Sequence, residues 1–404
     1  MVRVFRWSGV GLAAGVWVAC GLGWGQAVNE FPKRDDPLHV RVDLFDKLTR
    51  GNHWNEGAVM QHVIFPPAGN ETPIVGSQED CPFHTGAYLA ALSFRYAVTQ
   101  DPQVRQWADH TLEGVLKLEA VTGEPGCVAR SFNRTDGPNW HEKAYFFPME
   151  WHESTAMPGY RWMGDLSSDQ FTSLVFGVTI YWELCADDEH KAIAAGFLER
   201  MVGRCVEHNF RIMDVDGKMT LWGNFCPDLP HENLNAHLIL AHLKAAHRVT
   251  ASPAFSAAYK RLITKYHYDE EAIMAKVLWP VEWRNGSDDM LAAMAYYHLM
   301  RFEEDPALHA KYRMGLNRHW SLWKETTHVF YDMLYQVLTE EGVVDEDTVG
   351  AIKDLWGYER RRGRWTIPTT DGPKEVEAEE EGNAVFMILY YWFGRHYGFI
   401  DADW

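Results

Sequence analysis

Pairs of helices account for most of the sequence, and the first helix of each early pair is apolar on nearly every side. The segment 168–185 carries Leu174, Val175 and Phe176 in a nearly unbroken apolar run, whereas its partner, 188–209, is amphipathic. A helix that is apolar all round has to be buried, and an amphipathic helix covers it. The pattern therefore predicts an inner layer of helices enclosed by an outer layer.

The same pairing repeats along the chain without a run of alternating strands. We expect helices at 84–99 with 103–121, 168–185 with 188–209, 232–250 with 254–275, 286–303 with 306–324 and 328–340 with 344–359, then a last helix at 382–397. An extended segment precedes the first pair, and a long loop occupies 123–167. An open solenoid needs a more regular repeat than these unequal pairs show. We predict an all-α fold closed into an α/α toroid.

The first 27 residues have the pattern of a secretory signal peptide. Arg3 and Arg6 precede an apolar stretch, Trp7–Trp24, and the small residues of Gly25–Ala27 suit a signal peptidase. We predict a cleaved signal at 1–27, one domain at 28–404 and a secreted or periplasmic protein. No other stretch is long enough to span a bilayer, so we expect no integral membrane association.

The cysteines are consistent with export but define no disulfide framework. Cys20 follows Val18-Ala19, which leaves a lipoprotein as the alternative to a cleaved signal. The other five cysteines are Cys81, Cys127, Cys185, Cys205 and Cys226. Because five is odd and the spacings match no framework, we expect mostly buried free thiols. The pairings Cys185–Cys205 and Cys127–Cys226 remain alternatives.

Composition excludes some partners and favours others. The formal charge of −18 leaves no electrostatic footprint for nucleic acid or an anionic membrane surface. The 18 tryptophans suit either a packed core or the stacking of sugar rings. Two of them, Trp151 and Trp162, lie in the long 123–167 loop, where we expect them to bind a sugar.

Acidic residues gather where the apolar helices begin. Asp80 and His84 open the segment "EDCPFHTGAYLAALSFRYAVTQD", and Asp169 opens "SSDQFTSLVFGVTIYWEL". Helix N-termini in an inner layer converge on one face, and their unsatisfied N–H groups favour carboxylates. Ser167 and Ser168 can cap the second helix without Asp169. The surplus acid predicts a substrate site that includes Asp165 and Gln170.

A third cluster stands before the helix at 232–250. Its members, which combine aromatic, amide and acidic groups, are Trp222, Asn224, His231, Glu232 and Asn235. Stacking rings and amide groups are what a sugar site needs, and Glu232 is a further candidate acid. The run 214–217 is expected to be a tight turn rather than a calcium loop. We expect no metal and no cofactor.

The two helix starts resemble those of the unsaturated glucuronyl and rhamnogalacturonyl hydrolases, which are six-hairpin, (α/α)6 toroid enzymes. An Asp precedes a Gly- and Tyr-containing apolar helix that ends in Ala-Val-Thr-Gln-Asp, and a second Asp opens the next apolar helix. The resemblance implies an oligosaccharide substrate containing uronic acid. It implies that Asp169 protonates the C4=C5 double bond and activates water, while Asp80 steers its protonation.

Two other functions remain open. A polysaccharide lyase or uronyl C5-epimerase of this toroid group would use His84 with Tyr88, and a non-catalytic glycan-binding protein would use the aromatic residues alone. A uronate ligand also needs positive charge, for which Arg95, Arg130 and Arg161 are the candidates. The acidic run 375–381 is expected to be a solvated loop or helix start.

Overall fold

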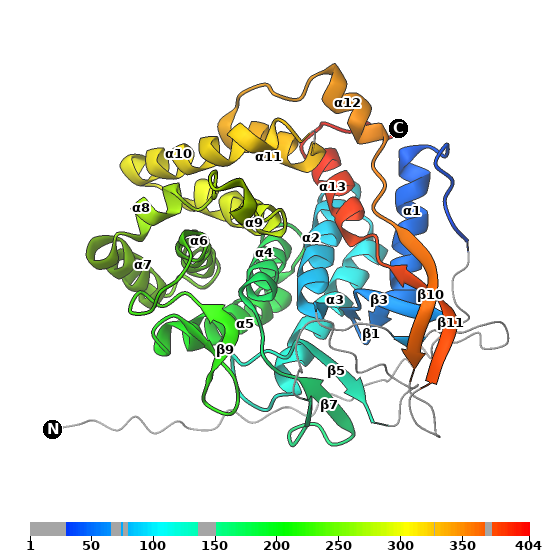
Figure 1. Cartoon of the computed structure of the whole chain (residues 1–404), viewed down its shortest axis with the longest axis horizontal. Coiled ribbons are helices and arrows are strands. Elements are labelled where there is room, and N and C mark those ends of the chain that lie inside the picture. The colour runs from blue at the N-terminus through cyan, green and yellow to red at the C-terminus, as the bar shows by residue number, and fades with distance from the viewer. Residues whose placement is uncertain (1–29, 66–73, 76–79, 136–150, 327, 368–373) are drawn as a thin grey trace.

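The computed structural model describes residues 30–65, 74–75, 80–135, 151–326, 328–367 and 374–404, and these are mostly helical (Figure 1). The described α-helices are α1 (Leu38–Leu48), α2 (Cys81–Thr99), α3 (Pro102–Ala120), α4 (Ser168–Leu184), α5 (Asp188–Glu207), α6 (Asn233–Thr250), α7 (Pro253–Tyr266), α8 (Tyr268–Ile273), α9 (Ser287–Phe302), α10 (Pro306–Trp323), α11 (Val329–Thr339), α12 (Glu346–Lys353) and α13 (Val385–His396). A π-helical turn, η1 (Thr49–His53), follows α1, and a 3₁₀ turn, η2 (Val281–Trp283), precedes α9.

Small antiparallel sheets accompany the helices. Their strands are β1 (Trp54–Asn55), β2 (Ala58–Val59), β3 (His62–Phe65), β4 (Ile74–Val75), β5 (Ser131–Arg134), β6 (Trp151–Glu153), β7 (Tyr160–Met163), β8 (Arg211–Met213), β9 (Met219–Asn224), β10 (Glu359–Ile367) and β11 (Lys374–Gly382). The sheet orders are β1-β2, β10-β11-β3-β4, β5-β7-β6 and β8-β9.

The helices that are apolar all round form the centre of the molecule. Helix α2 packs against α4 and α13, α6 packs against α4 and α9, and α11 packs against α9 and α13. Each has a run of consecutive buried residues, while α5, α7, α10 and α12 lie outside them in Figure 1. The predicted inner and outer helices are therefore present. Burial of apolar area by the inner helices is the main stabilising contribution.

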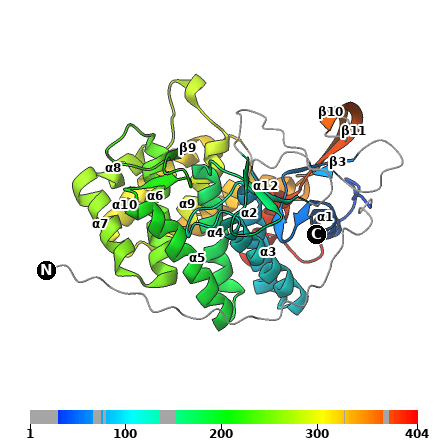
Figure 2. The same cartoon turned by 90° about the horizontal axis from the view of Figure 1, so that it is seen from below.

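The sheets lie at one end of the inner helices. Strand β4 leads into α2, β7 into α4, β9 into α6, η2 into α9 and β11 into α13. Each inner helix in this set therefore begins beside a strand or short turn. In Figure 2, β9, β3 and the β10–β11 hairpin lie along the same side of the molecule.

Several sequence expectations about local structure are wrong. The N-terminal stretch holds a helix, α1, because Leu38, Val42 and Phe45 form a stripe that is buried against the core. The described part of 123–167 forms the β5-β7-β6 sheet instead of a loop. The helix expected at 254–275 is broken at His267, which has a positive φ of 58°.

The acidic run near the C-terminus is the largest correction. Residues 375–381 belong to β11, which pairs with β10 along its whole length, and helix α12 ends at Lys353. Glu380 and Glu381 are buried. Arg361 on β10 pairs with Glu380, and Arg360, Asn52 and Tyr358 surround Glu381, so two glutamates are tolerated in a buried part of the strand where the sequence indicated a solvated loop.

Candidate active site

Two glycines bring the first two acid-bearing helices into contact. A Cβ atom on Gly177 of α4 would lie 2.1 Å from the carbonyl oxygen of Gly86 on α2, and a Cβ on Gly86 would lie 2.2 Å from that of Ser173. The Ser173 hydroxyl also donates to the Phe83 carbonyl at 2.6 Å. Only glycine permits this close backbone approach. The N-termini of α2 and α4 are therefore held together.

The close packing brings together the two helix ends that carry Asp80 and Asp169. Asp80 is the N-cap residue of α2, and Asp169 lies in the first turn of α4. Gln170 joins the two helix ends, because its Nε2 donates to Asp80 Oδ1 at 3.0 Å while its Oε1 accepts from the Ser167 backbone N–H at 3.3 Å. Ser167 and Gln170 form a capping box, and the Ser167 hydroxyl donates to Asp169.

The pKa of Asp80 is raised above its ordinary value of 3.8. Burial is the main cause and the charge of Asp169 the second, while Arg130 and the Gln170 hydrogen bond act in the opposite direction. Asp80 therefore holds a proton at a higher pH than a solvated aspartate does. A carboxyl group whose pKa is raised by burial and by a second carboxylate is a candidate for general acid–base catalysis.

Asp165 precedes α4, and its hydrogen bonds join two loop segments. Its φ of 65° is left-handed, its carboxylate accepts the Leu221 N–H at 2.6 Å, and its carbonyl accepts from Arg130 Nε at 2.6 Å. Its own N–H donates to Asp214 Oδ2 at 2.6 Å. Asp165 thus ties the entry of α4 to β9. The predicted turn at 214–217 is present between β8 and β9.

His84 lies one turn into α2, directly below Asp80. Burial, followed by the nearby His62 and His53 rings, lowers the pKa of His84 to about 3, so the imidazole is neutral. Among the described residues, its Nδ1 has no hydrogen-bond partner. Tyr88, one turn further, lies in the core and donates to Asp46 Oδ1 at 2.5 Å. The pair predicted for a lyase is therefore split between the site and the core.

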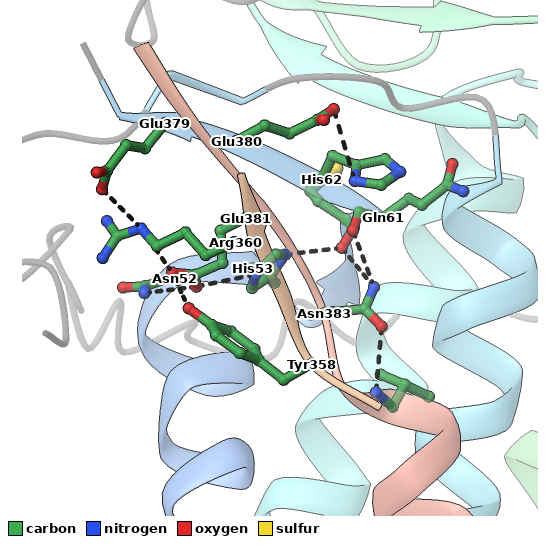
Figure 3. Close-up of polar contacts among 12 residues, drawn as sticks. Asn52, His53, Gln61, His62, Tyr358, Arg360, Glu379, Glu380, Glu381 and Asn383 are labelled. Carbon is green, nitrogen blue, oxygen red and sulfur yellow. Dashed lines mark hydrogen bonds and ion pairs between the residues drawn. The ribbon is translucent and has the colours of Figure 1, made fainter. Parts of the chain in front are cut away.

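A buried polar network lies at the foot of the β10–β11 hairpin, where Figure 3 shows Glu381 among Asn52, His53 and Tyr358. Glu381, which is fully buried, accepts hydrogen bonds from Asn52 at 2.9 Å and Tyr358 at 2.8 Å, and His53 Nε2 lies 3.2 Å away. These partners lower the pKa of Glu381 despite its burial. Because Asn52 and Tyr358 are more than 300 residues apart, no sequence spacing indicated this network.

In the predicted cluster before α6, some side chains bond within the loop and others are exposed to solvent. Asn224 donates to the Pro230 carbonyl at 2.8 Å, and Asn235 donates to the Asn224 carbonyl at 3.0 Å. His231 bonds Glu271 Oε2 at 2.8 Å. These three side chains hold the loop before α6. Trp222, in contrast, is 52% exposed on β9.

Glu232 is exposed at the N-cap of α6, and its charge acts on Asp288, which the sequence patterns did not single out. Burial, followed by the charge of Glu232, raises the pKa of Asp288 to about 6. Asp288 lies in the first turn of α9, whose opening, Ser287-Asp288-Asp289, has the same pattern as that of α4. This repeated sequence pattern at the start of an inner helix is the feature from which Asp288 could have been predicted.

The remaining predicted residues lie on the β5-β7-β6 sheet or elsewhere. Trp162 is buried and stacks on His152 with ring centroids 4.4 Å apart. Trp151 is half-buried, with the Arg161 guanidinium 5.3 Å from its ring. Arg95 binds Asp46 at 2.9 Å, far along α2 from Asp80. Of the three predicted cations, Arg130 is the one that acts on the pKa of Asp80.

The described part of the chain shows five free, buried cysteines, as expected. It shows no group of three or more His, Cys, Asp or Glu side chains that could hold a metal ion. None of its helices is long and apolar enough to cross a membrane. The predicted signal peptide and Cys20 lie outside the described residues. In comparisons with known proteins, no family model matches the chain and no curated protein matches it significantly.

Proposed function

We propose that this chain is an exported glycoside hydrolase that cleaves an oligosaccharide ending in an unsaturated uronic acid. The observation that carries the proposal is the buried carboxyl group of Asp80, which Gln170 links to the N-terminus of α4 and whose pKa is raised first by burial and second by the charge of Asp169. The helix packing supports an (α/α)6 toroid, since α2, α4, α6, α9, α11 and α13 contact one another in chain order and α13 returns to α2.

The two carboxyl groups have unequal environments, and this suggests their roles. Asp80 has the raised pKa, so we assign the proton donor to Asp80 and the activation of water to Asp169, which reverses the roles that the family resemblance implies. The proton adds to C4 of the double bond and the hydroxide of water adds to C5. The resulting hemiketal opens to a C5 ketone, and the hemiacetal left at C1 releases the next sugar as an alcohol. One water is consumed.

Neighbouring groups fit this chemistry. Gln170 orients the Asp80 carboxyl, and Arg130 supplies positive charge for an anionic substrate. His84 is buried and neutral, so we assign it no proton transfer in this reaction. The lyase alternative lacks such support because Tyr88 is buried and bonded to Asp46. A glycan-binding protein would keep the same site without turnover.

The test follows the ultraviolet absorbance of the C4=C5 bond in a panel of unsaturated uronyl disaccharides. We expect the absorbance to fall with the wild-type protein and the rate to drop by about 100-fold or more in Asp80→Asn and in Asp169→Asn. Asp101→Asn is the matched control, since Asp101 also caps a helix, α3, but follows the C-terminal end of α2. Its rate should be unchanged.

The pH profile separates the two roles. In Asp169→Asn the pKa of Asp80 should fall, because a repelling charge is removed. The pH above which the residual activity declines should therefore be lower than in the wild type. A rise in absorbance with saturated uronic oligosaccharides would instead show β-elimination. No change with any member of the panel would overturn the hydrolase proposal, and retained binding would then favour a glycan-binding protein.

A further inference from the structure

Two tryptophans on one loop are the most exposed large apolar side chains among the described residues. Trp279 is 81% exposed and Trp283 is 72% exposed, whereas Trp162, Trp323 and Trp392 are buried. An indole ring is one of the largest apolar surfaces a side chain offers, so its exposure is unfavourable unless a ligand covers it. The core therefore does not explain these two residues.

Hydrogen bonds hold the loop that carries them, 274–286, in a defined shape. The Arg284 side chain donates twice to the Leu278 carbonyl, at 2.9 Å from Nε and 2.6 Å from Nη2. Lys276 reaches across the base of the loop to the Asn285 carbonyl at 3.3 Å and also pairs with Asp289. The rings are thus presented on a fixed frame, which lowers the entropy cost of binding.

The loop stands on the same side of the molecule as the carboxylate pair. It leads into the N-terminus of α9, as β7 and β9 lead into α4 and α6. In Figure 2 the yellow-green segment between α8 and α9 and the β10–β11 hairpin project from this side. Asp169 lies at the start of α4, Trp222 and Glu232 precede α6, and the loop 274–286 leads to Asp288 at the start of α9.

The charges near the loop select the kind of ligand. Asp288 accepts a hydrogen bond from Asn285 of the loop at 3.0 Å, while Lys276 is paired with Asp289. Within the loop, Glu282 offsets the charge of Arg284. Carboxylates accept hydrogen bonds from sugar hydroxyls but repel uronates. Flat apolar rings on a loop that carries Glu282 and ends at Asp288 therefore fit neutral pyranose rings and disfavour a polyuronate.

We infer that Trp279 and Trp283 form a distal binding site for neutral sugar residues of a longer glycan. This inference rests on the proposed function for its place in the substrate: the unsaturated uronic acid sits at Asp80 and Asp169, and the neutral part of the chain extends towards the loop. The substrate is accordingly a uronide attached to neutral sugars.

The binding test uses the full chain carrying Asp80→Asn, which silences turnover, with calorimetric titration of neutral hexasaccharides derived from galactan, xylan and β-glucan and of a hexauronate. We expect at least one neutral hexasaccharide to bind and the added pair Trp279→Ala/Trp283→Ala to weaken it by about tenfold or more. Met314→Ala is the matched control, because Met314 is 58% exposed on the outer helix α10. It should leave binding unchanged.

Three results would overturn the inference: no neutral hexasaccharide binds, the double variant binds as well as its parent, or the hexauronate binds more tightly through the same tryptophans. Sedimentation of the parent and the double variant addresses a fourth, since a dimer lost with the tryptophans would make the loop a protein interface. Because this assay measures binding without turnover, its result is independent of the absorbance assay, which alone decides the hydrolase proposal.

Discussion

The close approach of α2 and α4 makes a prediction about Gly177→Ala. A Cβ atom essentially never comes within 3.0 Å of another heavy atom, yet it would lie 2.1 Å from the Gly86 oxygen, so the two backbones must separate by about 0.9 Å. Neither side of the contact is a flexible side chain. The cost of overpacking should therefore lie near the upper end of its usual range, about 3 kcal/mol.

Helix propensity works in the opposite direction. Replacing a helical glycine by alanine stabilises a helix by about 1 kcal/mol when nothing else changes. The expected net loss in the free energy of unfolding is therefore about 2 kcal/mol. Gly203→Ala in α5 is the matched control, because nothing lies within 4 Å of its added Cβ. It should gain about 0.5–1 kcal/mol.

Urea unfolding of the wild type and both variants measures these differences, with equal slopes as the check that the variants unfold alike. The double variant Gly86→Ala/Gly177→Ala should lose less stability than the sum of the two single variants, because one separation of α2 and α4 relieves both clashes. A Gly177→Ala protein as stable as the wild type, beside a stabilised Gly203→Ala, would refute the view that close backbone packing holds Asp80 against Asp169.

Three further predictions concern titrating groups. The folded-state pKa of Asp80 is raised, so its ionised form opposes folding; Asp80→Asn should increase stability at pH 7, and urea midpoints should converge with the wild type as the pH falls towards 3.8. Burial lowers the pKa of His242 to about 3 from 6.5, so the free energy of unfolding should fall as the pH drops below 6.5. His242→Gln should reduce this pH dependence by up to about 1.4 kcal/mol per pH unit, measured by urea unfolding at each pH. Glu381→Gln should lower the free energy of unfolding by about 3 kcal/mol at neutral pH, because it disrupts a buried charged network. Since the pKa of Glu381 is lowered, the stability difference between the variant and the wild type should shrink below pH 4.5 in thermal unfolding. An unchanged melting temperature at pH 7 would contradict the role given to the network.

The sequence by itself determined the helical layers and the acids at their entries. Helices apolar on all sides, such as α4, have no stable place except the interior, so composition and period decide their burial. Asp80 and Asp169 were identifiable because each begins such a helix. Helix N-termini favour carboxylates, and this local rule applies before any tertiary contact forms.

Tertiary structure alone decided how those acids meet and which other groups join them. The raised pKa of Asp80 comes from its burial and from the charge of Asp169, and the helices that carry them are brought close by Gly86 and Gly177, whose roles no periodicity reveals. Glu380 and Glu381 of β11 became buried because Arg361 on β10 and the side chains of Asn52 and His53 lay opposite them. Charge compensation and close packing act between segments far apart in the chain, so they exist only once the chain has folded.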